Sequence, residues 1–284
     1  MQLKKDTASI YIPDGMAEGP AIARTTHLGI GAHQDDLEFM AYHGILECFH
    51  SDSLWFGGVT CTNGGGSART GKYERFSDED MMGVRRKEQD VAAHLGNFSF
   101  MAQIDHPSSS IKDPANSDVA DDLTLLLEAA QPEVVYTHNP ADKHATHIGV
   151  VVSALQAVRN LPAEKRPKKM YGCEVWRDLD WMPDDAKVVL DVSGHENLAA
   201  ALNGVFDSQI AGGKRYDLAV QGRRLANATF FASHSTDDAE QIWFAMDLTP
   251  LVQDDSLDLV DYVGQYLDRF VEDVRTGLSQ RLGK

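Results

Sequence analysis

Two short segments of this sequence gather the side chains that can bind a metal ion or move a proton. These side chains are His33, Asp35 and Asp36 in the first segment and Asp142, His144 and His147 in the second. Two histidines and one aspartate from different loops are typical of a catalytic zinc site, in which three protein ligands leave one position open to water. We therefore predict a metal centre that holds Zn²⁺ or another divalent transition metal.

The first segment is expected to lie at a strand-to-helix junction. The apolar run 27–32 ends directly before His33, and residues 37–50 show the apolar spacing of a helix. Asp35 and Asp36 could serve there only as helix caps, because carboxylates accept hydrogen bonds from the first N–H groups of a helix. Capping does not require His33, however, and this histidine favours the metal interpretation.

The second segment follows a predicted strand, 133–138, and leads into a predicted helix, 148–159. His144 and His147 are three residues apart at the start of this helix, so both side chains should project from one face.

Alternating strands and helices should bring the two segments together. Strands are predicted at 54–62 and 98–104, and helices at 78–95 and 118–130. Short connections in this alternation indicate a Rossmann-like α/β fold, a three-layer α/β/α sandwich with a mainly parallel sheet. In the common strand order 3-2-1-4, the first and fourth strands are neighbours, and ligands bind beyond their carboxyl ends.

The rest of the chain should add a C-terminal α+β portion. Its predicted strands are 170–175, 187–192, 229–231 and 243–248, and its predicted helices are 195–209, 212–225 and 257–282. We divide the chain into an N-terminal extension (1–25), a metal-binding catalytic core (26–165) and a portion that completes the same domain (166–284). The final helix of the last portion should pack on the core or form a contact in a homo-oligomer.

Composition disfavours several classes of partner. The chain has 26 Lys and Arg against 43 Asp and Glu, a formal net charge of −17, which disfavours nucleic acids and anionic membrane surfaces. Its three cysteines form no CxxC pair, which indicates free thiols in a reducing compartment. No apolar run approaches the roughly 20 residues of a membrane helix. We expect a cytoplasmic protein that acts on a small molecule.

The motifs AHQDDLE and NPADKHATH, with TNGGGSARTGKYERF and VRRKEQDVAAHLG between them, resemble the PIG-L deacetylases, also called the LmbE-like family. The resemblance covers roughly residues 27–160. Members of this family are zinc-dependent enzymes that remove N-acetyl groups from amino sugars and their glycosides. The resemblance therefore implies an N-deacetylase with a small amino-sugar substrate. It also implies that residues 166–284 help to form the substrate rim and possible oligomer contacts.

The same resemblance implies a role for each candidate residue. The metal ligands would be His33, Asp36 and His147. Asp35 would be the general base, and His144 would stabilise the tetrahedral intermediate or help to protonate the leaving group. Arg69 and Asp142 occupy positions expected to bind substrate. The chain departs from the family pattern at Ala145 and Thr146, which replace the usual Pro-Asp before the last ligand.

Two alternatives remain open from the sequence. A magnesium-dependent phosphohydrolase could use the Asp35 and Asp36 pair, although His33 and His147 favour zinc over magnesium. A metal-binding or sugar-binding module without turnover is the other alternative, although such a module would not need Asp35.

Overall fold

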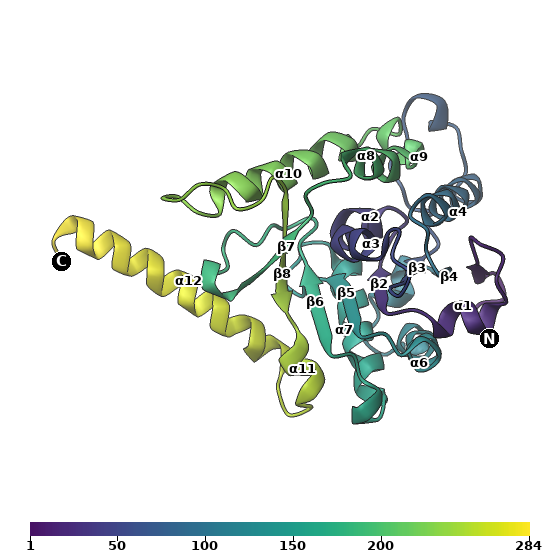
Figure 1. Ribbon diagram of the computed structural model, residues 1–284, viewed down its shortest axis with the longest axis horizontal. Helices are drawn as coiled ribbons and strands as arrows, with labels where there is room; N and C mark the ends of the chain where they lie inside the picture. Colours follow the sequence, from purple (N-terminus) through teal and green to yellow (C-terminus); the bar gives the residue numbers. More distant parts are fainter.

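Eight strands form one sheet in the computed structural model, which describes residues 1–284 (Figure 1). The strands are β1 (Ser9–Tyr11), β2 (His27–Gly31), β3 (Phe56–Thr62), β4 (Phe100–His106), β5 (Val134–His138), β6 (Lys169–Cys173), β7 (Lys187–Asp191) and β8 (Ile242–Asp247). Their order across the sheet is β1-β4-β3-β2-β5-β6-β8-β7. The central strands from β4 to β6 run parallel, while β1, β7 and β8 form antiparallel pairs at the edges.

The predicted strand order is confirmed. The four strands predicted in the first half are β2, β3, β4 and β5, and they lie in the order β4-β3-β2-β5. β2 therefore pairs with β3 on one side and β5 on the other. Their carboxyl ends lie together, as the topology requires.

Helices cover both faces of the sheet. They are α1 (Glu18–Ala23), α2 (Asp36–Met40), α3 (Tyr42–Cys48), α4 (Asp78–Leu95), α5 (Ser108–Ile111), α6 (Asp118–Ala130), α7 (Ala145–Asn160), α8 (Glu196–Gly204), α9 (Asp207–Ile210), α10 (Tyr216–Phe230), α11 (Thr249–Gln253) and α12 (Leu259–Leu282), with short 3₁₀ turns at Gly71–Tyr73, Ala163–Lys165 and Asp184–Ala186. One face carries α1, α6, α7 and α11, and the other carries α2, α3, α4, α8 and α10 (Figure 1). The predicted three-layer α/β/α class is thus confirmed.

Successive residues of β2 face opposite sides of the sheet, and each side has its own hydrophobic core. Leu28 and Ile30 point into the core beneath α6 and α7. Gly29 and Gly31 face the opposite layer, where a Cβ on Gly29 would lie 2.9 Å from a methyl of Leu37 in α2. The missing side chains allow α2 to pack close against the strand, and this fixes the start of α2 at the end of β2.

Three predicted elements are wrong in detail. The helix predicted at 37–50 is two helices, because the chain turns at Ala41 so that Met40 and Tyr42 can both be buried. The helix predicted at 195–209 likewise divides into α8 and α9. The predicted strand 229–231 overlaps the end of α10, which buries Ala228 while Phe230 is exposed. The short edge strand β1 was not predicted.

None of the helices is long and apolar enough to span a membrane.

Candidate active site

The junction between β2 and α2 presents the first group of candidate residues. Asp36 is the first residue of α2, and its Oδ2 accepts a hydrogen bond of 2.6 Å from the backbone N–H of His33. Asp35 stands in the N-cap position, but its side chain makes no capping hydrogen bond. The carboxylates are therefore not used as helix caps.

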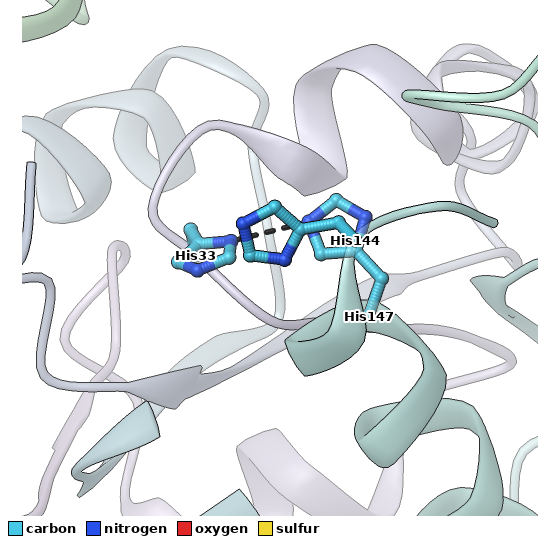
Figure 2. Close-up of side chains that lie close together, drawn as sticks. All are labelled: His33, His144 and His147. Carbon is cyan, nitrogen blue, oxygen red and sulfur yellow. Dashed lines mark hydrogen bonds between the residues drawn. The ribbon is translucent and has the colours of Figure 1, made fainter. Parts of the chain in front are cut away.

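The junction between β5 and α7 supplies the second group. His144 directly precedes α7 and His147 lies in its first turn. Because β5 is the neighbour of β2, the two groups meet (Figure 2). His33 Nδ1 lies 3.2 Å from His147 Nε2 and 3.3 Å from Asp36 Oδ2, and the last two atoms are 3.5 Å apart. These are the three residues that the family resemblance implied as ligands.

The spacing of these donor atoms fits a metal ion. A tetrahedral zinc ion with bonds of about 2.0–2.1 Å holds its ligand atoms about 3.3 Å apart. The three separations in the structure are close to this value. Two imidazole nitrogens and one carboxylate oxygen also suit zinc and related transition metals better than magnesium.

His138, at the end of β5, lies beside this cluster but is poorly placed as a ligand. Its Nε2 is 3.3 Å from Asp36 Oδ2, yet the backbone N–H of Ala32 already donates to the same nitrogen over 2.9 Å. The Nε2 lone pair is therefore occupied. Burial lowers the pKa of His138 to about 4, so the ring is neutral at pH 7.

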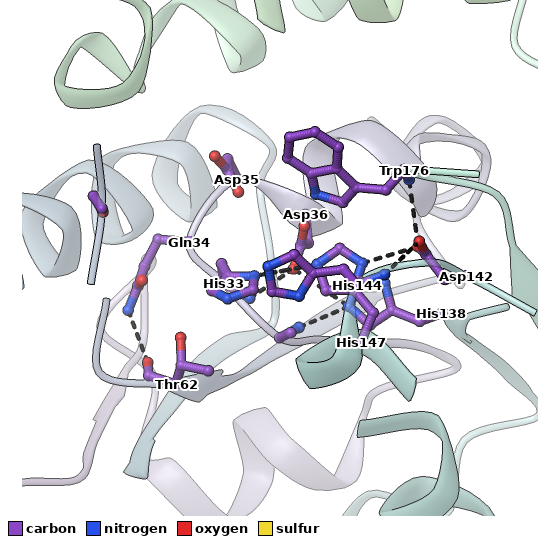
Figure 3. A network of polar contacts seen from close by, with 12 residues as sticks. His33, Gln34, Asp35, Asp36, Thr62, His138, Asp142, His144, His147 and Trp176 are labelled. Carbon is purple, nitrogen blue, oxygen red and sulfur yellow. Dashed lines mark hydrogen bonds and ion pairs between the residues drawn. The ribbon is translucent and has the colours of Figure 1, made fainter. Parts of the chain in front are cut away.

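Asp142 lies behind the cluster rather than in the cavity (Figure 3). Its Oδ2 is 3.0 Å from His147 Nδ1 and accepts a hydrogen bond from the backbone N–H of Trp176. A carboxylate at Nδ1 holds the proton on that nitrogen and leaves the Nε2 lone pair free for a metal. Asp142 thus contacts His147 and does not line the cavity, and its substrate-binding role stays a prediction.

Asp35 is buried in an unusual backbone conformation. Its φ is +114°, which a non-glycine residue rarely adopts, and its backbone N–H donates to Gln89 Oε1 over 3.2 Å. Burial raises the pKa of the Asp35 carboxyl well above its usual value, although Arg85, 3.6 Å away, opposes this shift. Both partners come from α4, which begins with a capping box formed by Ser77 and Asp80. A raised pKa suits a group that takes up and releases a proton.

A cavity of about 590 Å³ opens above these residues. His33, Asp35, Asp36 and His144 line it at the strand ends, and Trp176, Tyr216 and Phe39 add aromatic surface. The ring of Trp176 stacks on His144 with centroids 6.2 Å apart (Figure 3). Trp176 lies three residues beyond the end of β6, so the rule that ligands bind at the carboxyl ends of strands could have identified it from the sequence.

Basic side chains also line the cavity. They are Arg85, Lys112, Lys214 and Arg223. Arg85 is held by Asp35, Ser67 and the carbonyl of Gln34. The other three form no ion pair in the structure, which is unexpected in so acidic a chain. The sequence did not predict this cluster, because its members come from three distant segments.

Arg69 does not line the cavity. Its guanidinium donates to the carbonyls of Gly65 and Phe76 in its own loop and pairs with Asp78, the first residue of α4. The cavity is lined instead by smaller residues of this loop, among them Gly64 and Ser67. The substrate-binding role of Arg69 stays a prediction.

The mostly parallel sheet with helices on both faces is consistent with the LmbE-like fold, and a histidine and aspartate cluster lies at the carboxyl ends of adjacent strands. Residues 28–158 match the family described as PIG-L, GlcNAc-PI de-N-acetylase. This match covers the part of the chain that carries both motifs, so the predicted resemblance is confirmed for that part.

Several solved structures share the fold. The hydratase GalB of Pseudomonas putida KT2440, which acts on 4-carboxy-2-hydroxymuconate, is 18% identical with a TM-score of 0.60, over 79% of this chain and 96% of that one. The N,N'-diacetylchitobiose deacetylase of Pyrococcus horikoshii is 17% identical with a TM-score of 0.58, over 82% and 88%. The zinc-inhibited form of teicoplanin deacetylase Orf2 is 16% identical with a TM-score of 0.55, over 78% and 98%. None of the curated proteins compared matches the chain. The family, with deacetylases among the solved structures, supports a deacetylase.

Proposed function

We propose that this protein is a metal-dependent hydrolase that removes an N-acetyl group from an amino sugar or amino-sugar glycoside. The observation that carries the proposal is the convergence of His33, Asp36 and His147 donor atoms beside the buried carboxyl of Asp35, in one cavity. A divalent transition metal bound by the three ligands would act as a Lewis acid toward the amide carbonyl and acidify water.

The side chains of the cavity can perform the proton transfers of amide hydrolysis. Asp35 would accept the proton of the attacking water, and burial raises the pKa of its carboxyl toward neutral pH, which suits this task. His144 lines the same cavity and could donate a proton to the departing amine or a hydrogen bond to the tetrahedral oxyanion. Neither task requires Ala145 or Thr146, the positions at which the chain departs from its family.

The cavity walls favour a sugar that carries an acidic substituent. Trp176 and Tyr216 offer flat apolar surfaces on which a sugar ring can pack. Lys112, Lys214 and Arg223 are cations without a carboxylate partner, and they would offset the charge of a carboxylate or phosphate on the substrate. This preference is local, since the chain as a whole carries a net charge of −17.

A hydratase is the second candidate, because GalB has the same fold and the unpaired cations could equally bind an unsaturated dicarboxylic acid. A magnesium-dependent phosphohydrolase is less well supported, because two of the three converging donors are imidazoles.

The test combines metal content with substrate screening. Protein purified without chelators or a histidine tag would be analysed by mass spectrometry for metals, then loaded in turn with zinc, cobalt, manganese and magnesium. Zinc is titrated over a range of concentrations, since one deacetylase of this fold has a zinc-inhibited form. Acetate release would be measured with N-acetylglucosamine and N-acetylglucosamine 6-phosphate, and hydration by the absorbance of an unsaturated dicarboxylic acid.

The proposal predicts one transition metal ion per chain, acetate release that requires it, and loss of both in His147→Ala. Lys214→Met should raise the KM for the phosphorylated sugar only. Lys143→Met, which changes a residue outside the cavity, should leave the KM for both sugars unchanged. Loss of the unsaturated acid without acetate release would favour the hydratase. Failure to bind any of these metals would overturn the proposed mechanism.

A further inference from the structure

The C-terminal helix α12 projects from the body of the molecule (Figure 1). Its first two turns are anchored, with Leu259, Tyr262, Val263 and Tyr266 packed against the core. From Leu267 onward, every residue is exposed. Since helices in proteins gain most of their stability from packing, a free segment of this length calls for a partner.

The free part of α12 carries an apolar stripe. Leu267, Val271, Val274 and Leu278 follow one another at intervals of four, three and four residues, which is the spacing of a coiled-coil seam. These side chains are 43–60% exposed, and Phe270 adjoins them. A stripe of this kind on a soluble protein marks an interaction surface.

The charges beside the stripe are arranged so that two copies of the helix can be complementary in charge. Asp268, Glu272 and Asp273 come first, and Arg275, Arg281 and Lys284 follow. None of them forms an ion pair in the structure, whereas Arg269 is already bound to Asp185 of its own chain. Two such helices attract each other when they run antiparallel, because the acidic half of each then faces the basic half of the other.

We propose that two copies of this chain associate through α12, as an antiparallel helix pair around a two-fold axis. Val271 packs opposite the partner subunit's Val274, and Leu267 opposite the partner subunit's Leu278. Asp268 and Arg275 directly follow Leu267 and Val274, so they flank the same edge of the seam. In this register Asp268 of each copy lies beside the partner subunit's Arg275. A parallel pair would instead set Arg275 beside the partner subunit's Phe270.

A membrane surface is a weaker match for α12. Amphipathic helices that bind membranes carry a polar face rich in Lys and Arg. The free part of α12 has as many acidic as basic side chains in its two unpaired groups, which would weaken its binding to anionic lipids. The proposed dimer is independent of the reaction at the metal centre.

The first experiment measures the mass of the full-length protein in solution by light scattering across a concentration series. The wild type should be a dimer, and Val274→Asp should raise its dissociation constant at least tenfold while circular dichroism shows an intact fold. A wild type that stays monomeric at high micromolar concentration would overturn the proposal, as would a dimer that Val274→Asp leaves unchanged.

A charge exchange tests the antiparallel register. Asp268→Arg and Arg275→Asp should each weaken the dimer, because each variant sets like charges together at both contacts. Mixing the two variants should restore a heterodimer, in which both contacts are again between opposite charges. Asp273→Arg is the matched control, since it makes the same change away from the seam and should leave the dimer intact.

No recovery on mixing would rule out the proposed register. Co-sedimentation with anionic vesicles that Val274→Asp abolishes, together with a monomeric wild type, would identify a membrane as the occupant instead.

Discussion

Asp35 combines two features that cost free energy. A non-glycine residue with positive φ is held in a conformation that costs about 1–3 kcal/mol, and its carboxyl is buried with a single cation at 3.6 Å. Such strain persists only where the surrounding structure imposes it, here through Gln89, Arg85 and the packing of α2 on β2. The arrangement sets the carboxyl of Asp35, the proposed proton acceptor, beside the proposed metal ligand Asp36.

Asp35→Asn should separate proton transfer from metal binding. Asn tolerates positive φ and has the same shape, so the fold should be kept. We expect kcat to fall by about 10²- to 10⁴-fold, because the side chain can no longer accept a proton. Steady-state kinetics and metal analysis of the same sample check this. If the variant loses its metal as well, Asp35 is a ligand and the assigned roles are wrong.

Asp142→Asn should weaken the metal centre. Without the carboxylate, the Nδ1 proton of His147 is no longer fixed, and metal affinity should fall about 10- to 100-fold. Competition with a chromogenic chelator measures this change. Unchanged metal affinity with a raised KM would instead support the substrate-binding role assigned from the sequence.

At the scale of residues, what the sequence predicted depended on strand order. His33, Asp36 and His147 could be brought together because they lie at the strand-to-helix junctions of two strands that were predictable neighbours. Asp142 and Arg69 could not be placed in the same way. Their partners depend on the path of a loop and on side-chain rotamers, which apolar periodicity does not encode.

At the scale of elements, the packing of α2 on β2 positions the proposed ligands His33 and Asp36. A Cβ at Gly29 would lie 2.7 Å from the ring of Phe56 and 2.9 Å from Leu37. Gly29→Ala should therefore push α2 away from β2 and lower the free energy of unfolding by about 1–3 kcal/mol. Urea denaturation followed by circular dichroism measures the effect.

Gly83→Ala in α4 is the matched control. A Cβ at Gly83 meets no atom within 4 Å, so the change should stabilise the helix by about 0.5–1 kcal/mol. If both substitutions shift the unfolding midpoint in the same direction, close packing at Gly29 is not what α2 depends on.

Elements with strong periodicity were predicted well, and those whose ends depend on tertiary contacts were not. α4 and α6 have the predicted bounds. The turn at Ala41 is not marked by glycine or proline, because it arises from burial on both sides. Phe230 and Phe231 suggested a strand at 229–231. Phe230 is instead the last residue of α10, and its side chain is exposed rather than packed in the sheet.

At the scale of the molecule, the cavity is built from both halves of the chain. The proposed metal ligands come from the first half, whereas Trp176, Lys214, Tyr216 and Arg223 come from the second. The loop that follows β3 joins the halves, since Lys72 and Tyr73 both contact Asp207 in α9. The net charge of −17 does not predict the basic cavity, because the sum of charges over the chain does not say where each charge lies.

Metal binding should stabilise the whole fold, because the ligands come from two separate junctions that unfolding would pull apart. A ligand present at 1,000 times its dissociation constant adds about 4.1 kcal/mol to the stability of the state that binds it. Zinc or cobalt added to chelator-treated protein should therefore raise the melting temperature by several degrees. Differential scanning calorimetry at a series of metal concentrations would show the rise.

Asp36→Asn distinguishes this site from adventitious metal binding. The amide keeps the size of the side chain, and its oxygen can still accept from the N–H of His33. It lacks the charge that attracts the ion, so most of the rise in melting temperature should disappear. An equal rise in the variant and the wild type would mean that the metal binds elsewhere, and the closely spaced nitrogen and oxygen atoms at the ends of β2 and β5 would need another explanation.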